Sequence, residues 1–231
     1  MESVVLLMKS LGINDVAKFP FPTGPRESDL ETAMRHLIIT GGIDRTTLRI
    51  TALGKSMLQF PVPPRFAKML TTALKLKMKG ITEMVVCFVA VASTTLDIFE
   101  HGTVQEASRR DETQTRVADQ KRLLHSGSDL ITFLRAVGVF AVRPSISTCQ
   151  RFNIVHKTIV EANHLRNQLL TVLEGLTATD VSLIDDEKES ETLEEPSKGR
   201  RPTIFDSQGV CALSSENEIL LRKIISIGLS D

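Results

Sequence analysis

Apolar residues recur at intervals of three and four through most of the chain, which is the pattern of helices with one buried face. Glycines, prolines and charged runs interrupt this pattern and divide it into separate helices. In residues 84–93 the apolar residues surround the helix, which predicts a helix in the centre of a bundle. The predicted helices cover residues 2–11, 28–39, 51–60, 64–79, 82–93, 129–140, 153–174 and 215–227.

A short β-like segment separates the second and third predicted helices. Residues 48–52 alternate between apolar and polar side chains, and we expect them to pair with a second arm that includes Ile43. Thr51 is placed to cap the helix that follows. Two helices and a small hairpin form the element order of a winged-helix domain. The prolines of residues 61–64 then predict a stiff elbow, with Pro64 in the first turn of the next helix.

Further local boundaries follow from caps and breakers. Ser28 or Asp29 is predicted to cap the second helix, and Gly80 to end the fourth. The proline-rich connector of residues 19–25 cannot be helical, and we expect Phe19 and Phe21 in it to pack against a core.

The whole pattern predicts a mainly α protein in which a winged-helix domain precedes a helical bundle. The charged run of residues 183–203 has almost no apolar residue and is predicted to be a disordered linker. The chain begins inside a helix and ends without a further folded element, so we expect a fragment of a larger protein. The predicted parts are 1–70 (winged helix), 71–182 (bundle), 183–203 (linker) and 204–231 (C-terminal helix).

Composition and motifs mainly exclude kinds of binding site and active site. Lys and Arg together number 28, as do Asp and Glu, so there is no basic excess to indicate binding by unspecific phosphate attraction. The three cysteines are isolated and the five histidines scattered, which argues against a metal site. Phosphate-loop, serine-hydrolase and zinc-protease motifs are absent from the sequence. We therefore expect no active site, no bound cofactor and no membrane span in these residues.

One face of the helix predicted over residues 153–174 is the candidate for ligand contact. Lys157 and Arg166 can reach phosphates, while Asn153 and Asn163 can bond sugar or backbone oxygens. Arg135, on the helix before, completes the predicted RNA-binding set. The alternative is an ordinary solvated helix face.

Nearly the whole chain resembles the C-terminal helicase-associated region of DEAH-box RNA helicases. The stretch "TALGKSMLQFPVPPRFAKML" is similar to that family's signature LT-x-LG-x-x-M-x-x-FP-x-x-P-x-x-x-x-ML. The segments "SDLITFLRAVG" and "CQRFNIVHKTIVEANHLRNQL" resemble two helices of its ratchet domain. The signature residues are Thr51, Leu53, Gly54, Met57, Phe60, Pro61, Pro64, Met69 and Leu70.

The resemblance implies a winged helix followed by a ratchet bundle that helps to close a channel around single-stranded RNA. In such enzymes these domains pack on two RecA-like ATPase domains, which bind ATP and Mg, and on an OB-fold. The ATP-binding loop, the D-E-A-H box and the OB-fold lie outside this sequence, so the chain alone is expected neither to hydrolyse ATP nor to unwind RNA.

Several segments, among them "FPFPT" and "LRKIISIGLSD", look most like the family's nucleolar member in small-ribosomal-subunit biogenesis. That likeness implies pre-rRNA and protein activators as partners, and a location in the nucleus and nucleolus. The alternatives are a protein-interaction scaffold that has lost RNA contact, and a stand-alone winged-helix protein that binds nucleic acid.

Overall fold

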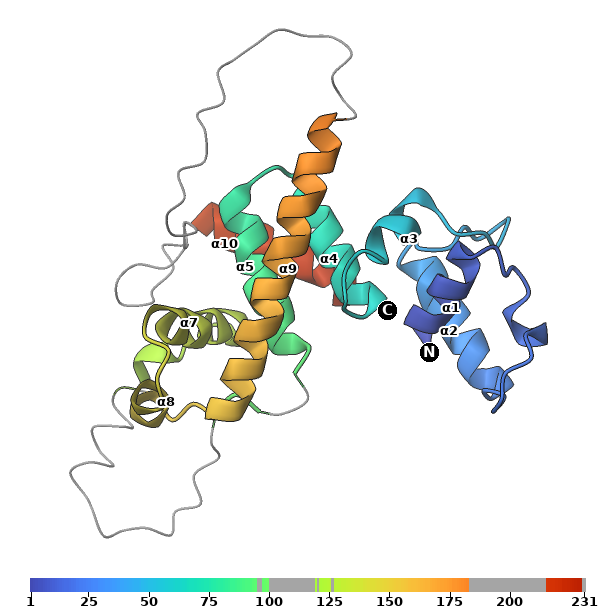
Figure 1. The fold of residues 1–231 in the computed structure, drawn as a ribbon. Helices are drawn as coiled ribbons and strands as arrows, with labels where there is room; N and C mark the ends of the chain where they lie inside the picture. Colours follow the sequence, from blue (N-terminus) through green and yellow to red (C-terminus); the bar gives the residue numbers. More distant parts are fainter. Residues whose placement is uncertain (95–96, 100–118, 120, 126, 183–214, 230–231) are drawn as a thin grey trace, which may run out of the picture. The chain divides into compact units, whose positions relative to one another are not determined.

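The computed structural model describes the chain except for residues 95–96, 100–118, 120, 126, 183–214 and 230–231 (Figure 1). The described part is mainly helical, as the hydrophobic pattern predicts. The charged segment of residues 183–203, predicted to be a linker, lies outside the described residues. The helices are α1 (Glu2–Ser10), α2 (Glu27–Ile39), α3 (Ala52–Met57), α4 (Pro64–Lys75), α5 (Lys79–Ala92), α7 (Asp129–Val142), α8 (Ile146–Phe152), α9 (His156–Ser182) and α10 (Ser215–Leu229), with a 3-10 turn η1 at Val16–Lys18.

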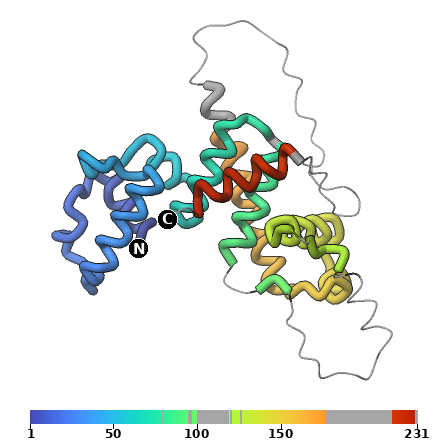
Figure 2. The backbone as a smooth tube through the Cα atoms, turned by 180° about the vertical axis from the view of Figure 1, so that it is seen from behind, coloured from blue at the N-terminus to red at the C-terminus, as the bar shows by residue number. Residues whose placement is uncertain are grey.

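The chain forms two compact units. The N-terminal unit comprises Met1–Val85 together with Ser214–Asp231, and the middle unit comprises Val86–Leu213. The division therefore falls inside α5, whereas the sequence pattern placed a domain boundary after residue 70. The reason is that α4 packs against α3 and against the returning α10, which lies across it in Figure 2. These contacts keep α4 within the N-terminal unit.

The predicted hairpin is present only as a minimal pairing. Ile43 and Ile50 form one antiparallel bridge, flanked by a hydrogen bond from the Asp44 amide to the Arg49 carbonyl at 2.9 Å. Leu48, two residues before Ile50, has a left-handed backbone with φ of 53°. The second arm is therefore not extended at Leu48. Among the residues that the structure describes, neither arm is long enough to form a β-strand. The winged-helix assignment therefore stays a prediction.

The glycine of the signature allows α3 to lie directly on the base of this hairpin. The Thr51 hydroxyl accepts a hydrogen bond from the Gly54 amide at 2.9 Å and donates to the Gly41 carbonyl at 2.7 Å. This confirms the predicted cap of α3. A β-carbon at Gly54 would lie only 2.2 Å from the Gly42 carbonyl oxygen. A residue without a side chain is therefore required at this position.

A buried lysine joins α1 to two loops of the N-terminal unit. Lys9 is 6% exposed, and its ammonium donates to the carbonyls of Asn14 at 2.7 Å and Leu48 at 2.8 Å. Burial lowers the pKa of this ammonium because the charged form loses its hydration. Lys9 thus holds the hairpin tip and the loop after α1 in place.

The proline elbow is compact. Phe60 is 4% exposed, Pro64 stands in the first turn of α4 as predicted, and α3 and α4 pack against each other. On the far side of α4, a β-carbon at Gly228 of α10 would lie 2.6 Å from side-chain atoms of Met69 and 2.7 Å from the Arg65 carbonyl. The α4–α10 crossing, like the α3 contact, is therefore a close approach at a glycine.

Some predicted boundaries were wrong. The N-cap of α2 is Arg26, without a side-chain hydrogen bond, so neither Ser28 nor Asp29 caps it. The turn after α4 is made by Lys77, which has a φ of 52°, and Gly80 lies inside α5 instead of ending α4.

The two phenylalanines of the connector pack differently from the prediction. Phe19 is 39% exposed and contacts the ring of Phe21 edge to face, with the ring centroids 5.0 Å apart. Phe19 therefore covers the ring of Phe21 and is not buried in a core.

The close approach of Gly54 predicts the effect of adding one methyl group. We expect Gly54→Ala to lower the free energy of unfolding by about 3 kcal/mol or more, because the facing backbone carbonyl cannot rotate away. Chemical denaturation followed by circular dichroism measures this change. The control is Gly80→Ala in α5, where a β-carbon would meet nothing within 4 Å and alanine favours the helix. Equal stability of the two variants would contradict the packing described for α3.

Candidate RNA-contacting face

The candidate site lies on α9 in the middle unit, and the turn before α9 sets where this helix begins. Ser145 caps α8 by accepting a hydrogen bond from the Thr148 amide at 3.2 Å. Asn153 ends α8 in a left-handed conformation with φ of 55°. Ile154, 2% exposed, then bridges to Phe99, and α9 starts at His156. The sequence pattern merged this turn and α9 into one helix and missed α8.

An ion pair with a buried carboxylate fixes the segment in front of α7 to α8. The Asp119 side chain is 8% exposed and accepts a hydrogen bond from the Arg151 Nε at 2.7 Å. Arg122 approaches the same carboxylate at 3.2 Å. The hydrogen bond from Arg151 is the main reason that the pKa of Asp119 is lowered. This pair was not predicted from the sequence, because the residues around Asp119 are strongly polar; most of residues 100–121 lie outside the described residues.

Arg135, one of the predicted RNA-binding residues, has a structural role in this network. Its Nη1 donates to the carbonyls of Arg122 at 3.3 Å and Leu124 at 3.2 Å. The guanidinium thus ties α7 to the segment that carries Asp119. Asn153 is likewise occupied as the left-handed cap of α8. The Arg135 side chain and the Asn153 backbone therefore help to shape the segments around α9.

The three predicted residues on α9 do not share one face. Asn163 and Arg166, three residues apart, lie on neighbouring positions of the helix, whereas Lys157 is roughly half a turn away from Arg166. Lys157 is exposed. Arg166 is only 9% exposed, so the prediction of an outward position was wrong for this residue. It belongs to the inner face with Ile159, Ala162 and Leu169, because it continues their three-and-four spacing.

The inner polar pair on α9 is incompletely hydrogen-bonded. The Asn163 Oδ1 and the Arg166 Nε are both buried, and neither has a hydrogen-bond partner among the residues that the structure describes. Arg166 Nη1 donates to Asn167 Oδ1 at 3.2 Å. A buried charged group that lacks an acceptor is costly, and such groups are rare in native proteins. The pair offers one acceptor and one cationic donor to an incoming polar group.

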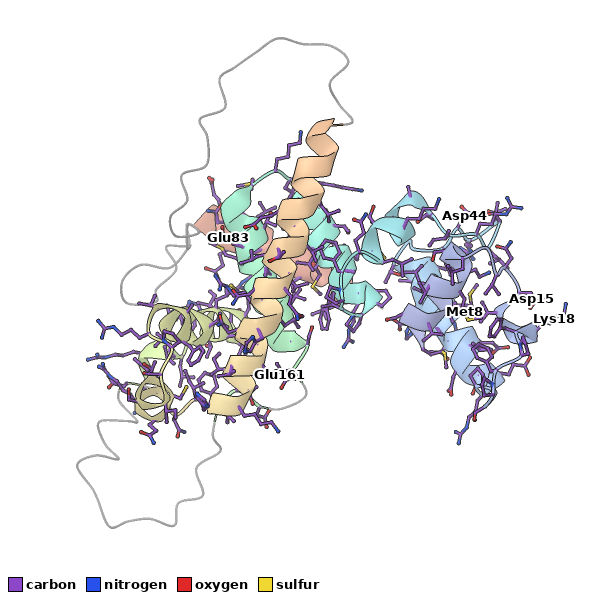
Figure 3. All side chains as sticks on the ribbon, viewed as in Figure 1. Met8, Asp15, Lys18, Asp44, Glu83 and Glu161 are labelled. Atoms are coloured by element: carbon purple, nitrogen blue, oxygen red, sulfur yellow. The ribbon has the colours of Figure 1, made fainter. Side chains whose placement is uncertain are left out.

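Other kinds of site are not found in the described residues. Within the described ranges, no group of three or more His, Cys, Asp or Glu side chains is arranged to hold a metal ion. No described helix combines the length and the apolar character needed to cross a membrane. Glu161, labelled in Figure 3, is exposed on α9.

Comparison with known proteins identifies the region. Residues 63–133 match the family model described as the helicase associated domain (HA2), ratchet-like. The match begins at Pro63, within the proline elbow. The protein therefore carries a helicase-associated, ratchet-like domain.

Similar proteins show which kind of helicase carries this domain. The chain is 31% identical over 202 residues to the human probable ATP-dependent RNA helicase DHX37, covering 76% of this chain and 17% of that protein. It is 31% identical over 203 residues to kurz, a probable ATP-dependent RNA helicase of Drosophila melanogaster, covering 79% and 16%. It is 27% identical over 255 residues to the ATP-dependent RNA helicase DEAH13 of Arabidopsis thaliana, covering 100% and 20%.

The chain thus corresponds to the C-terminal helicase-associated region of DEAH-box RNA helicases. It spans one fifth or less of the length of these relatives.

The Asp119 ion pair makes a pH-dependent prediction. In the folded state the pKa of Asp119 is lowered, so the stability that the carboxylate contributes is present above about pH 4 and is lost as the pH falls through the folded pKa. We expect Asp119→Asn to cost about 1 kcal/mol at pH 7, because Arg151 is partly exposed and its charge is screened.

The measurement is the difference in unfolding free energy between wild type and Asp119→Asn from pH 7 down to pH 2.5. This difference should shrink below about pH 4, where the wild-type carboxyl also becomes neutral. Asp15→Asn is the control, because the Asp15–Lys18 pair is exposed on both sides and is expected to contribute little (Figure 3). A difference that stays constant with pH would contradict a stabilising role for the Asp119 charge.

Proposed function

We propose that this chain is an accessory RNA-channel module of an ATP-dependent DEAH-box RNA helicase. The observation that carries the proposal is the unpartnered pair of Asn163 Oδ1 and Arg166 Nε on α9. A phosphate oxygen of single-stranded RNA would accept from the guanidinium, and a ribose hydroxyl would donate to the amide oxygen. The relation to ATP-dependent RNA helicases makes RNA the nucleic acid of choice.

Arg166 is covered in the structure, so RNA contact requires the side chains around it to move. Lys157, which is exposed, is the residue that first attracts the RNA backbone. Arg166 and Asn163 engage as the helicase core of the same enzyme closes the channel. A single exposed lysine gives only weak binding on its own. This order of events therefore needs no excess of basic residues, and the chain has no net charge.

We further infer a role in pre-rRNA processing and small-ribosomal-subunit biogenesis, in the nucleus and nucleolus. The support is the likeness of "FPFPT", "LRAVG" and "LRKIISIGLSD" to the nucleolar member of the family. ATP, Mg, an OB-fold and protein activators belong to the intact enzyme in this proposal. The chain alone is expected to bind RNA weakly and not to hydrolyse ATP.

RNA binding by the full chain tests the proposal. We expect Arg166→Gln to weaken binding of a fluorescent single-stranded RNA about tenfold, the effect of losing one charge-assisted hydrogen bond. Lys157→Met should weaken binding less and reduce its salt dependence by about one ion. The measurement is fluorescence anisotropy over a range of salt concentrations, with crosslinking to pre-rRNA in cells for the biological substrate.

Arg143→Gln is the matched control, because this exposed arginine follows α7 and lies outside α9. All variants must keep the wild-type circular dichroism spectrum. Unchanged RNA binding in both α9 variants would favour the protein-interaction scaffold instead. Robust ATP hydrolysis by the purified chain would overturn the proposal of an accessory module.

A further inference from the structure

The charges of the chain are unevenly distributed, although they sum to zero. Residues 45–82 contain eight Lys and Arg residues and no Asp or Glu. The rest of the chain therefore has an excess of eight acidic residues over basic ones. The basic segment lies entirely within the N-terminal unit and includes α3 and α4 (Figure 1). The predicted contacts on α9, in the middle unit, do not account for it.

Three of these cations lie in a line on the outward side of α4. Arg65, Lys68 and Lys75 are spaced by three and seven residues, which places them on one face of the helix. Arg65 and Lys75 are exposed, and Lys68 is half-buried. We call these three residues the α4 stripe, which extends over about 15 Å along the helix axis. The buried face of α4 lies opposite and includes Phe66, Met69, Leu70 and Ala73.

Within the described part of the chain, no acidic side chain neutralises the α4 stripe. None of its three cations forms an ion pair there. Thr72 lies between Lys68 and Lys75, and its hydroxyl donates to the Lys68 carbonyl at 2.7 Å, so this gap is filled by a neutral side chain. Like charges at this helical spacing are destabilising, and an anionic ligand would remove that cost.

The Arg65 side chain is already oriented. Its guanidinium carbon lies 4.8 Å from the centroid of the Phe66 ring, which is a cation–π contact with a buried aromatic side chain. This contact does not use the N–H donors of the guanidinium. Arg65 therefore offers a fixed fork of donors, which suits the oxygens of a phosphate group.

We propose that the α4 stripe binds the phosphate backbone of RNA as a second contact, separate from α9. A strand of a duplex carries one charge per about 3.4 Å of axis, so a stripe of about 15 Å can face several successive phosphates. Arg65 bonds one phosphate through its fork, and Lys68 and Lys75 act as point charges. The choice of RNA among nucleic acids rests on the proposed function, because the stripe itself recognises only phosphates.

RNA fits the α4 stripe better than an acidic protein segment does. Protein interfaces depend on apolar or aromatic anchors at their centre. Between Arg65 and Lys75 this face of α4 carries Lys68 and Thr72 and no apolar side chain. A row of cations without an anchor is typical of contacts that hold a nucleic-acid backbone without reading its bases.

The salt dependence of RNA binding by the full chain tests the proposal. We expect the triple variant Arg65→Gln, Lys68→Gln and Lys75→Gln to lower the slope of log affinity against log salt by about 2, because each contact to a single strand contributes about 0.7. Between about 200 and about 50 mM salt, wild type should gain roughly twentyfold more affinity than this variant. The measurement is fluorescence anisotropy with a fluorescent single-stranded RNA.

Two further variants separate the charge of the stripe from its place in the fold. Arg65→Lys with Lys68→Arg and Lys75→Arg keeps three cations and should retain the wild-type slope. Lys75→Gln alone, at the exposed end of α4, should lower the slope by about 0.7 and gives the same test if the triple variant unfolds. Circular dichroism checks that each variant is folded.

The matched control is the triple variant Lys18→Gln, Arg26→Gln and Arg35→Gln. It removes three exposed cations of the same unit that lie outside residues 45–82. Its slope should equal that of wild type, and an equal loss in this control would overturn the proposal. So would an acidic peptide of Asp and Glu that binds the chain as tightly as RNA of equal charge, because the partner would then be a protein.

The same experiment distinguishes this contact from the one on α9. An unchanged slope in the α4 triple variant, together with weaker binding by Arg166→Gln, would overturn the α4 stripe and leave the proposed function intact. A lowered slope in the α4 triple variant, together with unchanged binding by the α9 variants, would support the stripe and contradict the contact on α9.

Discussion

The packing of the N-terminal unit depends on how closely the backbones of its helices approach neighbouring segments. Gly54 brings α3 onto the carbonyl of Gly42, and Gly228 brings α10 onto the carbonyl of Arg65 in α4. A core without Trp or Tyr has few large side chains to define the angle between helices. Close contact at glycine supplies that definition, because only one placement of each helix avoids a steric clash. The hairpin and the elbow are both attached to elements positioned in this way.

The sequence predicted the elements that rest on local rules. Thr51 caps α3, Pro64 starts α4 and the apolar spacing of residues 129–140 forms a helix, because each depends on neighbours within a few residues. The predictions that were wrong depended on tertiary contacts. Gly80 is accommodated inside α5, and Lys77 makes the turn that a glycine was expected to make. Phe19 stays exposed and contacts the ring of Phe21.

In the candidate site, too, local spacing was predictive and tertiary contacts were not foreseen. Helical spacing alone places Arg166 in line with Ile159 and Ala162, but its charge argued for an outward position, and the spacing prevailed. Asp119 could not be recognised as a buried residue from its strongly polar neighbourhood, since its partner Arg151 is distant in sequence. Arg135 donates to a backbone carbonyl of the segment before α7, and Asn153 ends α8 in a left-handed conformation; neither could be read from residue type. RNA contact by α9 stays a prediction, because residue type alone does not assign roles that depend on three-dimensional contacts.

The return of α10 to the N-terminal unit has a consequence for biosynthesis. The surface of α4 that α10 covers is made early, whereas α10 follows only after the whole middle unit has been translated. A ribosome adds about 5–20 residues per second, so this surface stays uncovered for many seconds. The middle unit can fold on emergence, while the N-terminal unit must wait for its last helix. The nascent chain therefore exposes an apolar helix face that a chaperone is suited to shield.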